Sequence, residues 1–145
     1  MSAQPTPWNW RGLDSGGAGD LWEELVAWVC WLVRRYGLSE DVPACWWAHG
    51  AMVEELTALR AAWIVAFEDP SATMDAPLGW HERLAAALTR LAGWDRLGCR
   101  RGTHRPDDAV AWVIDEEALK AHIGDDTDLR PWFFELDAEL VEGQC

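Results

Sequence analysis

The chain lacks the features by which a sequence most often declares a membrane location or an activity. Its 145 residues contain no apolar run of about eighteen, the length that a membrane-spanning helix requires. The first ten residues lack the basic and then apolar layout of a signal peptide. The phosphate-binding GxGxxG and Walker patterns, the GxSxG nucleophile elbow and the HExxH zinc motif are also absent. We therefore expect a cytoplasmic, non-membrane protein, and no enzyme class is indicated.

Lysine and asparagine are almost missing, whereas tryptophan is abundant. One Lys stands against eleven Arg, there is one Asn, and there are 12 Trp. The first two counts fit a GC-rich coding sequence and so bear on source rather than fold. Each aromatic side chain can bury about 150–250 Å², so a chain of single-domain length can build a large core.

Charge is distributed unevenly along the chain. The net charge is −13, and the acidic C-terminal part, residues 106–145, holds twelve acids against two bases. A basic cluster from Arg96 to Arg105 precedes it, and neutralisation of this cluster by the acidic part is the simplest account. We expect no direct binding to duplex DNA. Asp125, Asp126 and Asp128 are candidate contacts for a partner protein with a basic surface.

Hydrophobic periodicity predicts a mainly α fold: a compact domain of about four to five helices over residues 20–145, behind an N-terminal arm over residues 1–19. Asp20 with Glu23 resembles a capping box, so the first helix should begin there and end before Gly37. Two apolar stripes make this helix hydrophobic on most sides, which predicts that it is central or covered twice.

The stretch from Cys45 to Phe67 predicts the central helix, whose apolar stripe should face the core: Met52, Leu56, Leu59, Trp63 and Phe67. A short turn over residues 43–49 should precede it because Gly50 interrupts the pattern, and one of Trp46 and Trp47 should enter the core. Trp80 to Trp94 has the spacing of a third helix, which Gly98 should close. Six side chains are predicted to form the core: Trp28, Leu32, Leu56, Trp63, Leu84 and Leu91.

The remaining segments give weaker signals. Residues 109–114 are apolar and fit a short strand or hairpin as well as a helix start. A short helix is expected over 115–123 and a last one over 132–140. In the arm, Trp8 and Trp10 should either lie across the helices or form an exposed partner-binding segment.

Two Cys/His pairs are candidate metal ligands. Cys45 and His49 are four residues apart, one helical turn, and Cys99 and His104 are five apart across a loop. Two Cys and two His suit tetrahedral zinc, and closed four-ligand sites are usually structural. Alternatively, the cysteines are buried thiols and the histidines surface or capping residues. His81 could replace one ligand or leave an open catalytic position.

A resemblance to a known family spans residues 7–108 and is carried by five short segments: PWNWRGL, WLVRRYGL, VPACWWAHGAMVEELTALRAAW, GWHERL and CRRGTHRPD. In them the chain resembles an uncharacterised family of short Trp-rich proteins from plasmids, phages and integrated elements of actinobacteria. The resemblance implies a mobile-element context. It also groups His81 with the two Cys/His pairs, but it implies no activity.

Three functions fit these observations. The first is a non-enzymatic accessory protein that binds another protein, and its small size and missing motifs favour it. The second is an acidic inhibitor that mimics DNA, with residues 107–142 imitating phosphate charge. The third is a small metal-dependent hydrolase, for which an open metal site in a cleft would be required.

Overall fold

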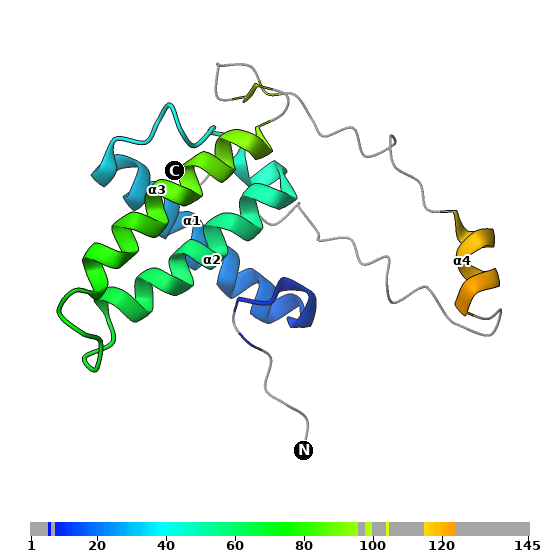
Figure 1. Cartoon of the computed structure of the whole chain (residues 1–145), viewed down its shortest axis with the longest axis horizontal. Helices are drawn as coiled ribbons and strands as arrows, with labels where there is room; N and C mark the ends of the chain where they lie inside the picture. Colours follow the sequence, from blue (N-terminus) through cyan, green and yellow to red (C-terminus); the bar gives the residue numbers. More distant parts are fainter. Residues whose placement is uncertain (1–5, 7, 96–97, 100–103, 105–114, 124–145) are drawn as a thin grey trace.

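The computed structural model describes residues 6, 8–95, 98–99, 104 and 115–123, and in them it is built of helices alone (Figure 1). The predicted mainly α fold is confirmed. The expected strand over 109–114 and the helix over 132–140 lie outside the described residues. No helix in the described part combines the length and apolar character needed to span a membrane. In chain order the elements are η1 (Trp10–Gly12), α1 (Ser15–Tyr36), η2 (Trp46–Ala48), α2 (Gly50–Phe67), α3 (Ala76–Trp94) and α4 (Glu116–Ile123).

Helix α1 begins earlier than predicted. Asp14, not Asp20, is its N-cap, and the Asp14 Oδ1 accepts a 2.7 Å hydrogen bond from the Gly17 amide. A Cβ on Gly17 would lie only 3.2 Å from that carboxylate, so glycine suits the capped turn. The predicted boundary between arm and domain therefore falls inside α1. The other end agrees with the prediction, since Gly37 has a φ of 66° and terminates the helix in the left-handed conformation.

Helices α2 and α3 form a hairpin, and α1 packs across it (Figure 1). The connection between them, residues 68–75, has eight residues and is short enough to make the two helices neighbours. The buried Trp80 of α3 donates its indole N–H to the Leu59 carbonyl of α2 at 3.1 Å. Arg90 and Glu55 add an ion pair at 2.6 Å on the surface of the hairpin. Helix α2 begins at Gly50 directly after η2, as the sequence predicted.

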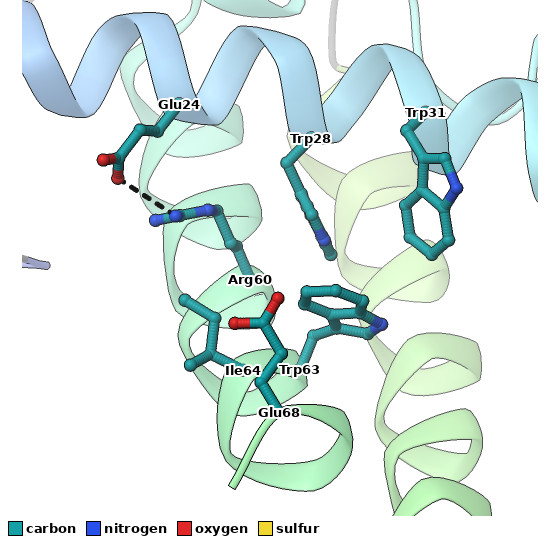
Figure 2. A pocket seen from close by; sticks show the side chains of 7 residues that line it. All are labelled: Glu24, Trp28, Trp31, Arg60, Trp63, Ile64 and Glu68. Carbon is teal, nitrogen blue, oxygen red and sulfur yellow. Dashed lines mark hydrogen bonds and ion pairs between the residues drawn. The ribbon is translucent and has the colours of Figure 1, made fainter.

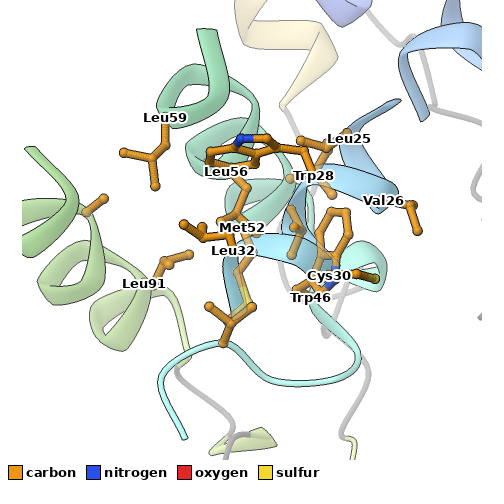
Figure 3. Close-up of a cluster of buried hydrophobic side chains, with 14 of the residues drawn as sticks. Leu25, Val26, Trp28, Cys30, Leu32, Trp46, Met52, Leu56, Leu59 and Leu91 are labelled. Atoms are coloured by element: carbon orange, nitrogen blue, oxygen red, sulfur yellow. The ribbon is translucent and has the colours of Figure 1, made fainter. Parts of the chain in front are cut away.

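One hydrophobic core joins the three long helices (Figure 3). The two apolar stripes of α1 are buried from Leu21 to Leu32, whereas Val33 and Tyr36 at their ends are half-buried. Trp46 is buried and Trp47 is half-buried. Five of the six predicted core residues are buried: Trp28, Leu32, Leu56, Leu84 and Leu91.

The sixth, Trp63, is only half-buried, and Phe67 beyond it is 42% exposed. The prediction that the apolar stripe of α2 stays in the core along its whole length is therefore wrong. Helix α1 crosses α2 at an angle and does not follow it through its last turn (Figure 1). The end of the stripe consequently reaches the surface.

Candidate metal centre

Two segments, one before α2 and one after α3, bring Cys45, His49, Cys99 and His104 together. Their side-chain donor atoms all lie within 4.8 Å of one another. The two Cys/His pairs that the sequence suggested thus meet in space, although 50 residues separate His49 from Cys99. This arrangement makes the four residues a candidate metal site.

The first pair is positioned by the break between η2 and α2. Cys45 precedes η2, and His49 is the residue between η2 and α2, with an extended backbone. The His49 side chain does not cap α2, while its carbonyl accepts hydrogen bonds from the amides of Met52 and Val53. The break that η2 and the extended His49 form before α2 therefore lets both side chains of the pair approach the same point.

The second pair follows the end of α3. The Cys99 amide donates a 2.8 Å hydrogen bond to the Asp95 carboxylate, directly after the last turn of the helix. Gly98, with a φ of 72°, provides the left-handed residue that reverses the chain there. The prediction that Gly98 closes α3 is wrong, because the helix ends at Trp94 and Gly98 lies four residues beyond it. Gly98 instead turns the chain just before Cys99.

The distances within the cluster match a tetrahedral ion. His49 Nε2 lies 3.5 Å from the sulfur of Cys45 and 3.5 Å from that of Cys99, and His104 Nδ1 lies 3.9 Å from the Cys99 sulfur. With Zn–S near 2.3 Å and Zn–N near 2.0–2.1 Å, tetrahedral angles place sulfur and nitrogen ligands about 3.6 Å apart. Thiol hydrogen bonds explain the same contacts less well, because a neutral imidazole nitrogen can accept only one of them.

Burial and neighbouring groups set the protonation state of the Cys45 thiol in the cluster. His49 and Cys99 are buried, Cys45 is half-buried and His104 is exposed. Burial, followed by the hydrogen bond to Cys99 and the charge of that thiol, raises the pKa of the Cys45 thiol to about 11. Protein groups alone thus disfavour the thiolate, whereas a divalent cation would stabilise it.

The other predicted site residues do not join this cluster. Trp10 is 1% exposed and donates its indole N–H to Thr57 Oγ1, so it is a core residue and is not available to a partner. Trp8 is 55% exposed. His81 lies beside Tyr36, whose hydroxyl is 3.1 Å from His81 Nε2, and is not part of the group of four. Asp125, Asp126 and Asp128 lie outside the described residues.

Sequence reasoning missed a second feature, an exposed group of aromatic rings at the other end of α2. Trp31 and Phe67 are its most exposed members. A signal was available, because Trp31 belongs to neither apolar stripe of α1 and so has no place in the core.

Comparisons of the chain with models of protein families, with curated proteins and with solved structures gave no match.

Proposed function

We propose that this chain is a non-enzymatic accessory protein that works by binding another protein, and that a structural zinc ion closes its fold. The observation that carries the proposal is the set of four convergent ligands, Cys45, His49, Cys99 and His104. A tetrahedral zinc ion held by four side chains has no position left for water or substrate, which is the mark of structural sites. A zinc hydrolase is disfavoured for the same reason.

Zinc would join parts of the fold that are distant in sequence. Cys45 and His49 sit at the start of α2, and Cys99 and His104 follow the end of α3. The ion would therefore fasten the open end of the α2–α3 hairpin, opposite the loop that connects the two helices. Zinc is favoured over harder cations because two of the four ligands are thiolates.

The binding function is supported by aromatic side chains left at the surface. Trp31 and Phe67 are 41% and 42% exposed, and neither burial nor the metal site accounts for them. Exposed apolar groups that lie together often mark contacts with other proteins. The mobile-element context implied by the resemblance to actinobacterial plasmid and phage proteins belongs to this proposal as well.

The metal is tested by elemental analysis and native mass spectrometry of protein purified without chelator. We expect one zinc per chain, and replacement by cobalt(II) should give the visible absorption of a tetrahedral thiolate complex. His81→Asn is the matched control, because His81 lies outside the cluster, and it should keep the metal. A parent protein with clearly less than one zinc per chain would overturn this part of the proposal.

The binding function is tested by photo-crosslinking in an actinobacterial host. A photoreactive amino acid at Trp31 should give a discrete crosslinked product with another protein. The same group at Trp94, which is equally exposed but lies at the far end of α3 from His81, should not give that product. Identical products from both positions, or none from Trp31, would contradict the proposal.

A further inference from the structure

Five aromatic side chains form a closed ring of contacts on one surface of the helical body. Ring centroids are 5.3 Å apart for Trp31 and Trp63, 5.6 Å for Trp63 and Phe67, and 6.2 Å for Phe67 and His81. Tyr36 closes the circuit, 5.8 Å from His81 and 6.1 Å from Trp31. We call these five residues the aromatic face.

Buried tryptophans hold the aromatic face from beneath. Trp80 is fully buried and contacts Tyr36, Phe67 and His81, while Trp28 contacts Trp31 and Trp63. Rings packed in this way have little freedom to rotate, so the surface is already formed before any partner arrives. Preformed aromatic contacts lose little entropy when they bind.

A groove of about 480 Å³ borders this face between α1 and α2 (Figure 2). Its charged groups are Glu24, Arg60 and Glu68. Arg60 is already paired with Glu24 at 3.0 Å, and among the described residues Glu68 makes no ion pair or side-chain hydrogen bond. Figure 2 shows the Glu68 carboxylate beside the Trp63 ring. Apolar side chains supply the rest of the lining: Trp28, Trp31, Trp63 and Ile64.

These groups determine the charge of the ligand that the groove can bind. One carboxylate is left over, and the indole rings beside it present faces of negative electrostatic potential. Arg34 and Arg35 lie on the other side of Trp31, in a separate hollow, and do not neutralise Glu68. The groove is therefore complementary to a cation with a flat, weakly hydrated surface.

We propose that this groove receives an arginine side chain from a basic segment of the partner protein. The guanidinium group would stack on the rings of Trp31 and Trp63 and would pair with the Glu68 carboxylate. Arginine fits better than lysine because its planar group stacks on aromatic rings and sheds water more readily. The inference rests on the proposed protein-binding function and names the chemistry of the partner.

The probe is a blocked glycine pentapeptide with arginine at its second and fourth positions. It is titrated into the full-length protein labelled with nitrogen-15, and the indole N–H signals are followed by NMR. The variants Trp31→Phe and Trp63→Phe assign the indole N–H signals of these two residues. We expect both to shift with a saturating curve, less with a lysine peptide, and not with the citrulline peptide, which has the same shape but no charge.

Two variants make the test specific. Glu68→Gln should raise the apparent Kd about threefold, because it removes the one carboxylate that is unpaired among the described residues lining the groove. Glu40→Gln changes an exposed carboxylate outside the groove and should leave the Kd unchanged. Added salt should weaken arginine binding further.

Equal effects of both variants, or shifts spread over all indole signals, would show general attraction to an acidic protein and would overturn the proposal. Self-association through the aromatic face, detected by native mass spectrometry and abolished by Trp31→Ala, would overturn it in favour of a second copy. A specific crosslink at Trp31 without arginine binding would leave the proposed function standing and reject only this chemistry. Arginine binding without any crosslinked partner would do the reverse.

Discussion

Trp8 and Trp10 are two residues apart in sequence and differ completely in environment. Trp10 is 1% exposed, and its indole N–H donates a 2.9 Å hydrogen bond to the buried Thr57 hydroxyl. Trp10→Phe removes this donor and part of the ring, and we expect it to lower the free energy of unfolding by about 1–2 kcal/mol. Trp8→Phe should cost less than about 0.5 kcal/mol because Trp8 lies at the surface. Urea denaturation measures both.

Equal losses in the two variants would contradict this difference and would indicate that the segment carrying both residues packs differently.

The hydrogen bond from Trp10 has a second consequence for Thr57, whose hydroxyl also donates to the Val53 carbonyl at 2.6 Å. The hydroxyl thus acts as donor and acceptor at once, so a buried polar side chain is satisfied within the core.

At the scale of single residues, the sequence predicts burial well where another helix covers the apolar side, and poorly where that side extends beyond the covering helix. Leu56 and Trp63 lie on the same stripe of α2, yet only Leu56 is buried. The spacing of a stripe says which side of a helix is apolar. It does not say how far along that side a crossing helix extends, because this depends on the crossing angle.

Two glycines at helix positions should respond oppositely to alanine. Gly79 lies within α3, and a Cβ there would meet no atom within 4 Å. Gly79→Ala should therefore raise the free energy of unfolding by about 0.4–1 kcal/mol through the entropy of the unfolded chain. Gly37→Ala should lower it by about 1 kcal/mol, because alanine resists the φ of 66° that ends α1.

Thermal or urea unfolding of the two alanine variants beside the parent gives both signs. A stabilised Gly37→Ala variant would mean that α1 does not end in the left-handed conformation in solution. A destabilised Gly79→Ala variant would place another group against that side of α3.

The metal cluster links two elements, and its variants should behave as one unit. Cys45→Ser and Cys99→Ser should each prevent zinc binding and lower the melting temperature by the same amount. The double variant should be little worse than either one, because each change already breaks the same closure. Losses that simply add would show that the two thiols stabilise the fold separately, as buried side chains without a shared ion.

Most of the elements could be predicted from sequence, and so could the pairing of ligands within each segment. Helix α1 shows where local signals mislead. Asp20 has the better capping pattern, but Asp14 is the cap because its carboxylate accepts a hydrogen bond from the Gly17 amide, and glycine leaves room for that contact. The hypothesis that Cys45 meets Cys99 rests on ligand type and on the resemblance, which groups the two pairs. The geometry of this meeting depends on how α2 and α3 pair, which spacing along the chain does not contain.

On the scale of the whole molecule, α2 carries two different features at its two ends. His49, a ligand of the candidate metal centre, precedes its first residue, and Trp63 and Phe67 of the aromatic face belong to its last turns. At a rise of 1.5 Å per residue, His49 and Trp63 are about 21 Å apart along the axis. The structure therefore separates the site that would stabilise the fold from the surface that would meet a partner.

This separation predicts that zinc and the arginine peptide act independently as long as the helices stay folded. Removal of zinc with a chelator should lower the melting temperature, because the ion ties the start of α2 to the loop after α3. Below the melting temperature of the zinc-free protein, the Kd of the arginine peptide should change by less than about twofold, since no ligand of the ion touches the groove. Circular dichroism follows the first quantity and the indole NMR signals follow the second. A loss of peptide binding on chelation, while the helical signal stays intact, would show instead that α2 transmits the state of the metal centre to the aromatic face.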